Sequence, residues 1–169
     1  MTRAYLALGG NIGDVAGEFL RALQALASAE GVRVAAVSRV YRTPPWGVTD
    51  QPDFLNMAAA VETAVPPRAL LDLCLGIEQA RGRVRNERWG PRNIDIDVIA
   101  YGDARVDEPD LTIPHPRAHE RAFVLAPLAD IAPELMLHGA TVRDWLTRAD
   151  ASGVHVDADA SASLQDASL

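Results

Sequence analysis

Two aspartates stand one residue apart in the run NIDIDVIAY, residues 93–101, whose other side chains are mostly apolar. The run is typical of a β-strand, in which residues two apart point to the same face. Asp95 and Asp97 should therefore share one face, opposite Ile94, Ile96 and Val98. Roughly 6.6 Å of strand rise separates the two backbone positions, so the carboxylates could converge on one metal ion or straddle two. The alternative is a polar strand face that meets solvent.

Arginines crowd the residues just before this strand: Arg81, Arg83, Arg85, Arg88 and Arg92. Guanidinium groups bind phosphate oxygens through paired hydrogen bonds. Magnesium held by carboxylates, with arginines beside it, is typical of enzymes that transfer a phosphoryl group from a nucleoside triphosphate. The alternative is an exposed surface loop, which suits Arg81 and Arg88 best.

The composition limits the chemistry available to the chain. All 16 basic residues are arginine, which excludes a P-loop lysine, a kinase-type ATP lysine and a Schiff base. The net charge of −7 argues against a nucleic-acid partner. No signal-peptide pattern and no apolar run near the ~20 residues of a membrane span is found. The chain has one cysteine, Cys74, so it cannot form a disulfide within itself. We expect a cytoplasmic protein that has no membrane partner and acts as a monomer.

Apolar periodicity predicts an α+β fold, a ferredoxin-like α/β sandwich with a mainly antiparallel sheet. Helices should cover one face, and long active-site loops should lie over the rest. Strands are expected at 4–8, 32–42, 54–62 and 93–101, with helices after the GGNIGD turn, after Pro66 and after Thr141. Residues 1–148 should form one domain, followed by a mobile tail, 149–169, rich in Ala, Ser and Asp.

Four motifs, in this order, resemble those of the 6-hydroxymethyl-7,8-dihydropterin pyrophosphokinase family: LALGGNIGD, YRTPPWGVTDQPDFLN, GRVRNERWGPRNIDIDVI and TIPHPRAHERAFVLAPL. The resemblance implies transfer of pyrophosphate from ATP to the hydroxymethyl group of a reduced pterin, with release of AMP, in folate biosynthesis. It also implies that Asp95 and Asp97 hold two magnesium ions (Mg2+), which bridge the phosphates and contact the attacking hydroxyl.

The resemblance further implies a role for individual residues. The catalytic positions would be Asp95, Asp97, Arg83 and Arg92. The ATP site would contain Glu78, Arg83, Trp89, Arg92, Thr112, His115 and Arg121. The pterin pocket would contain Thr43, Pro44, Pro45, Trp46, Gly47, Phe54, Asn56, Trp89 and Phe123. A flat heterocycle calls for stacked aromatic rings and for an amide such as Asn56 at its edge, although core packing is the alternative for Phe54 and Phe123.

Two other functions remain open from the residues alone. A two-metal nucleotidyl transferase would also use Asp95 and Asp97, but it would need a third carboxylate and a basic nucleic-acid track. A binding module could hold the nucleotide or pterin without turnover. Residues Trp46, Phe54 and Pro116 differ from those of some family members, which indicates that ligand contacts there differ in detail.

Overall fold

The computed structural model describes residues 1–45, 50–81, 93–165 and 169. Its centre is a six-stranded antiparallel sheet with the order β10-β3-β4-β1-β5, in which β2 also pairs with β4. The strands are β1 (Thr2–Gly10), β2 (Val32–Val37), β3 (Tyr41–Thr43), β4 (Phe54–Thr63), β5 (Asp95–Tyr101) and β10 (His155–Val156). The predicted α+β class and mainly antiparallel sheet are confirmed.

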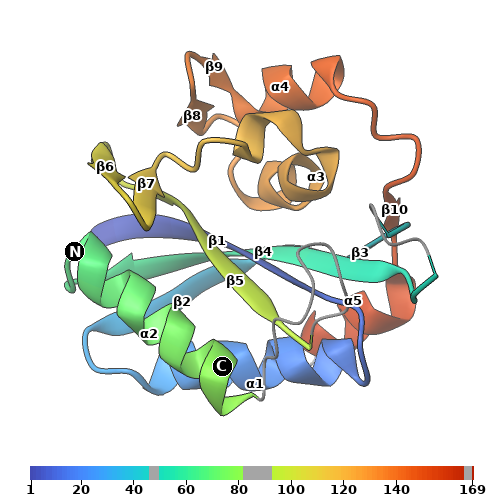
Figure 1. Cartoon of the computed structure of the whole chain (residues 1–169), viewed down its shortest axis with the longest axis horizontal. Helices are drawn as coiled ribbons and strands as arrows, with labels where there is room; N and C mark the ends of the chain where they lie inside the picture. Colours follow the sequence, from blue (N-terminus) through green and yellow to red (C-terminus); the bar gives the residue numbers. More distant parts are fainter. Residues whose placement is uncertain (46–49, 82–92, 166–168) are drawn as a thin grey trace.

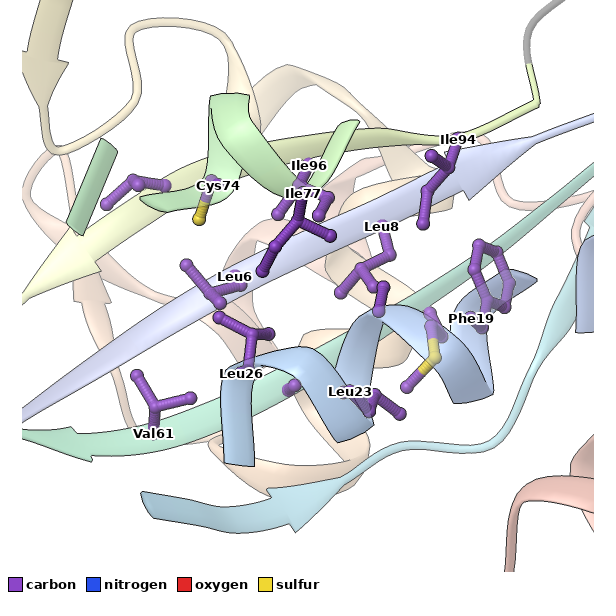
Figure 2. Packing of buried hydrophobic residues seen from close by; sticks show 14 of the residues in the cluster. Leu6, Leu8, Phe19, Leu23, Leu26, Val61, Cys74, Ile77, Ile94 and Ile96 are labelled. Carbon is purple, nitrogen blue, oxygen red and sulfur yellow. The ribbon is translucent and has the colours of Figure 1, made fainter. Parts of the chain in front are cut away.

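Three helices, α1 (Val15–Ser28), α2 (Pro67–Ala80) and α5 (Ala158–Gln165), cover one face of the sheet (Figure 1). Leu6 and Leu8 of β1 and Ile96 of β5 pack there against Phe19, Leu23 and Leu26 of α1 and Cys74 and Ile77 of α2 (Figure 2). Asp14 caps α1, since its carboxylate accepts a hydrogen bond of 3.1 Å from the backbone N–H of Gly17. This core fixes which face of β5 turns away from α2.

The opposite face is partly covered by α3 (Ala122–Ile131), on which α4 (Val142–Arg148) packs, so the expectation that helices cover only one face is wrong (Figure 1). The physical reason is a second apolar cluster, in which Leu125 and Leu128 pack on Ala58 and Ile99 of the sheet. Ile99 shares its strand face with Asp95 and Asp97. The helices therefore cover one end of that face, near Ile99.

The predicted strand at 32–42 is two strands, because Ser38 interrupts it. The buried Ser38 hydroxyl accepts a hydrogen bond of 2.8 Å from the backbone N–H of Ala58 and donates one of 2.7 Å to Arg39 O. A side chain thus replaces a backbone ladder bond. The sequence GGNIGD also differs from its predicted turn, since Gly9 and Gly10 continue β1 and pair with Asn56 and Leu55.

Part of the segment expected to be a mobile tail, 149–169, packs on the domain. β10 pairs with β3, and α5 buries Ala160, Ser161 and Leu164 against the main core. The sequence ADASASLQ carries so few large apolar residues that its contact face is not evident from periodicity.

Two small hairpins and a short 3-10 helix complete the described ranges: β6 (Val106–Glu108) with β7 (Leu111–Ile113), β8 (Met136–Leu137) with β9 (Ala140–Thr141), and η1 (Ala118–Glu120). The bond between Ile113 and Pro114 is cis. Within these ranges, every helix is too short or too polar to cross a membrane.

Candidate active site

The aspartate pair lies on the open part of the sheet. Ile94, Ile96 and Val98 are buried in the core beside α2, whereas Asp95 and Asp97 are partly accessible and line a cavity on the other face. The predicted separation of the two faces of this strand is confirmed. Strand alternation alone therefore brings both carboxylates to the same opening.

The first hollow, which we name the sheet cavity, has a volume of about 270 Å³ and lies over β1, β4 and β5 beside α3. Its lining includes Asp95, Asp97, Arg121 and four of the residues predicted for the pterin pocket, namely Thr43, Phe54, Asn56 and Phe123. Asn56 and Thr43 are only 8% and 4% exposed, and the Asn56 amide donates a hydrogen bond of 3.0 Å to the Thr43 hydroxyl. The sheet cavity thus combines aromatic rings with a buried amide held in a fixed orientation.

Gly9 makes room for that amide. It lies opposite Asn56 in the sheet and also lines the sheet cavity. A Cβ atom added to Gly9 would stand 3.0 Å from Oδ1 of Asn56, so a larger residue would push the amide out of place. The sequence analysis missed Gly9, although its alternation with Tyr5 and Ala7 along β1 places it on this face.

The second hollow, which we name the edge cavity, has a volume of about 440 Å³ and follows the outer edge of β5. Three predicted nucleotide-binding residues line it, namely Glu78, Thr112 and His115. Asp97 lines both this cavity and the sheet cavity. The two hollows therefore share Asp97 as a common lining residue.

Glu78 is 2% exposed and holds the edge strand of this site. Its Oε1 accepts a hydrogen bond of 2.7 Å from the backbone N–H of Ile96, which lies between the two aspartates in the chain. β1 is the strand that pairs with β5 in the described sheet, so this N–H faces away from the ladder and α2 supplies its acceptor. Glu78 consequently fixes the backbone from which both aspartates project.

Replacing Glu78 with alanine should lower the free energy of unfolding by about 1–3 kcal/mol, because the Ile96 N–H would lose its acceptor in a buried place. The Glu78→Gln variant keeps an acceptor oxygen and should lose less. Urea denaturation of both variants measures the difference. Equal stability of the alanine variant and the parent protein would show that this hydrogen bond contributes nothing.

His115 also takes one defined form. Burial, assisted by the nearby positive charge of Arg121, lowers the pKa of His115 from 6.5 to about 4, so the ring is neutral at neutral pH. Its Nδ1 accepts a hydrogen bond of 3.1 Å from the backbone N–H of Arg117. The proton of the neutral ring must then be on Nε2, which leaves His115 a hydrogen-bond donor through that nitrogen.

The lowered pKa of His115 predicts a pH-dependent stability. Between pH 6.5 and about 4 the unfolded chain binds more protons at this residue than the folded protein does. The free energy of unfolding should fall as the pH drops through this window, by about 2 kcal/mol from pH 7 to pH 5. The His115→Gln variant should lack this contribution. Urea denaturation at several pH values, without ligands or metal, tests the difference, and identical pH profiles would contradict it.

Arg121 lies half-buried at the start of α3. Burial lowers the pKa of its guanidinium group, while the negative charges of Asp97 and Asp95 act in the opposite direction. The guanidinium carbon is 5.9 Å from the centre of the Phe123 ring. Arg121 thus brings a positive charge to the sheet cavity, close to the aspartates.

The family description "7,8-dihydro-6-hydroxymethylpterin-pyrophosphokinase (HPPK)" matches residues 5–133, well over half of the chain. The chain belongs to the HPPK family. HPPK activity is pyrophosphoryl transfer to the hydroxymethylpterin in folate biosynthesis, so the sequence-based prediction of family and function is confirmed.

Curated HPPK relatives match over most of their length. The 2-amino-4-hydroxy-6-hydroxymethyldihydropteridine pyrophosphokinase of Methylorubrum extorquens is 56% identical over 91% of this chain and 98% of its own. The proteins of the same name from Pseudomonas aeruginosa and Bacillus subtilis are each 44% identical, over 80% and 78% of this chain respectively.

Solved structures of HPPK-DHPS proteins share the fold. A Plasmodium falciparum HPPK-DHPS triple mutant superposes with a TM-score of 0.69 at 17% identity, over 87% of this chain. The match spans only 41% of that longer chain. A second HPPK-DHPS structure, in complex with substrates, gives a TM-score of 0.68 over 43% of its chain.

Not every predicted HPPK site residue can be placed. Trp46, Gly47, Arg83, Trp89 and Arg92 lie outside the described residues. Pro44 and Pro45 follow β3 directly, but they are not in the lining of the sheet cavity or the edge cavity. Conversely, the cavities include residues that the sequence analysis did not select, namely Arg117 and Glu120 in the sheet cavity and Asp110 in the edge cavity.

Proposed function

We propose that the reduced pterin occupies the sheet cavity, that ATP occupies the edge cavity, and that pyrophosphate passes between them at the aspartate pair. One observation carries this proposal: Asp97 lines both cavities. A transfer reaction needs the reacting atoms of its two substrates held next to each other, and two cavities that share a lining residue allow this.

Magnesium fits the donor set at this junction. It binds oxygen ligands and is usually held by one or two carboxylates together with substrate phosphates and water, which suits Asp95 and Asp97. Within residues 1–45, 50–81, 93–165 and 169, no group of three or more His, Cys, Asp or Glu side chains could hold a metal ion. In this proposal the remaining ligands come from ATP and water. When bound, magnesium offsets phosphate charge and lowers the pKa of the substrate hydroxyl.

The residues of the sheet cavity would orient the pterin. The Asn56 amide, fixed by Thr43, would hydrogen-bond to the edge of the heterocycle, and Phe54 and Phe123 would pack against its faces. With its ring held there, the hydroxymethyl group would face the aspartates. Because the Asn56 side chain is already held in place, binding of the pterin would not have to pay the entropy cost of ordering it.

Other residues would bind the triphosphate. Arg121 would reach the phosphate oxygens from the sheet cavity, beside the aspartates, with its guanidinium fork. The neutral His115 would donate a hydrogen bond from Nε2 in the edge cavity. Arg83 and Arg92 are proposed for the same task from the sequence. The hydroxymethyl oxygen would attack the β-phosphorus, the bond from that phosphorus to the α–β bridging oxygen would break, and AMP would leave with that oxygen. The hydroxyl proton would pass to solvent.

Product analysis tests this proposal. The protein is incubated with magnesium, ATP and 6-hydroxymethyl-7,8-dihydropterin, and the adenine nucleotides are separated. AMP that appears only when the pterin is present is the expected result. ADP would instead mean single phosphoryl transfer, and tight ATP binding without turnover would favour a binding module.

We also propose a cytoplasmic monomer. The chain has one cysteine, Cys74, and therefore no disulfide within itself, which suits a reducing compartment. Sedimentation at assay concentrations would test the monomer.

A further inference from the structure

The segment from Asp150 to Gln165, which we name the C-terminal clamp, runs back along the edge of the sheet at β3 (Figure 1). It lies beyond residues 5–133, the part of the chain that matches the HPPK family description. β10 pairs His155 with Arg42 and Val156 with Tyr41. The clamp therefore turns β3, which would otherwise be the edge of the sheet, into an internal strand.

The clamp also binds the backbone of Val40, the residue just before β3. Ser161 Oγ accepts a hydrogen bond of 2.8 Å from the backbone N–H of Val40, and Asp157 N donates one of 2.8 Å to Val40 O. An Asp157 carboxylate oxygen lies 2.6 Å from Nη2 of Arg42. Both backbone groups of Val40 are thus bound by residues more than a hundred positions later in the chain.

The residues that follow Val40 connect the clamp directly to the sheet cavity. β3 is only three residues long, and it ends in Thr43, whose hydroxyl accepts the hydrogen bond from the Asn56 amide. Beyond Thr43, Pro44 packs against the clamp, since a Cβ atom added to Gly153 would lie 3.4 Å from Pro44 Cδ. A strand this short is poorly fixed by one neighbour alone, because few ladder bonds hold it. The clamp supplies the second neighbour.

We propose that the C-terminal clamp is a positioning element for the pterin: it fixes β3 so that Thr43 and Asn56 hold the heterocycle in the sheet cavity. This inference rests on the proposed function, in which the sheet cavity is the pterin site. The clamp lies on the far side of β4 and β1 from the edge cavity, so its effect should fall on the pterin and not on ATP.

The test compares two double variants of α5 and its N-terminus. Asp157→Ala with Ser161→Ala removes the side-chain contacts to Val40 N and Arg42 and leaves the backbone hydrogen bond from Asp157 N to Val40 O. Asp159→Ala with Ser163→Ala changes the same residue types on the exposed side of the helix. We expect the first pair to raise the KM for the pterin at least tenfold, with the KM for ATP unchanged within twofold. The second pair should leave both values unchanged. Gly153→Val, which would place a branched side chain in contact with Pro44 and leaves α5 intact, should also raise the KM for the pterin alone.

Several results would overturn the inference. The first is an unchanged KM for the pterin in the Asp157/Ser161 double variant and in Gly153→Val. The second is an equal rise in the KM for the pterin and the KM for ATP, together with a lower melting temperature, because that is the effect of general destabilisation. Asn56→Ala separates this failure from that of the proposed function. If Asn56→Ala raises the KM for the pterin and the clamp variants do not, only the inference is wrong. If Asn56→Ala also has no effect, the sheet cavity is not the pterin site.

Discussion

Replacing Asp97 with alanine is expected to lower kcat by roughly 1,000-fold, because it removes one of two carboxylates where the charge of the transferring phosphates must be offset. The fold should survive, since Asp97 faces a cavity and the apolar side of β5 carries the packing. The rate of AMP formation at saturating magnesium, ATP and pterin measures the effect, and circular dichroism reports on the fold. Asp95→Ala should behave in the same way.

Asp103→Ala is the matched control for both aspartate variants. Asp103 lies exposed in the turn after β5 and should be replaceable without loss of rate. A folded Asp97→Ala protein that turned over at near-normal rate with magnesium would show that the carboxylate does not serve the reaction. A loss of rate of the same size in Asp103→Ala would trace the effect to the strand as a whole.

Replacing Arg121 with alanine is expected to lower kcat/KM for ATP by about 10- to 100-fold, because a charge-assisted pair of hydrogen bonds to phosphate contributes a few kcal/mol. Arg121→Lys keeps the charge but loses the planar fork, so it should recover only part of the activity. Steady-state kinetics with varied ATP measures both variants. The size of the loss in the lysine variant separates the role of geometry from that of charge.

Arg143→Ala provides the control for Arg121. Arg143 is exposed on α4, where it pairs with Glu134 at 2.5 Å, away from both cavities. Its replacement should leave the kinetics unchanged. An Arg121→Ala protein with unaltered kcat/KM for ATP would place this guanidinium outside the phosphate site.

Strand alternation and motif order made much of the site predictable. Asp95 and Asp97 could be assigned to one face because a strand has a period of two residues, and Ile94 and Ile96 identify the buried side. The grouping of Thr43 with Asn56 came from the family motifs, and the hydrogen bond between their side chains joins them in the structure. Local patterns predict these placements because the strand that carries each residue determines which way its side chain points.

Other features depend on contacts between distant parts of the chain. Ser38 interrupts a β-branched run because its hydroxyl meets Ala58 on the neighbouring strand, and no local pattern reveals that partner. The packing of the clamp could not be predicted from local sequence for the same reason, because the buried Ser161 hydroxyl binds Val40, far away in the chain. The junction of the two cavities at Asp97 likewise follows from the placement of α3 and of the loop around His115.

The most direct test of the central claim is the location of the two substrates relative to the aspartates. Crystals grown with manganese, a non-hydrolysable ATP analogue and the reduced pterin would give it, with manganese located by its anomalous scattering. We expect two manganese peaks at Asp95 and Asp97, the pterin beside Asn56, and the triphosphate running past Thr112 and His115. Metal peaks away from both aspartates, or both ligands within one cavity, would contradict the account.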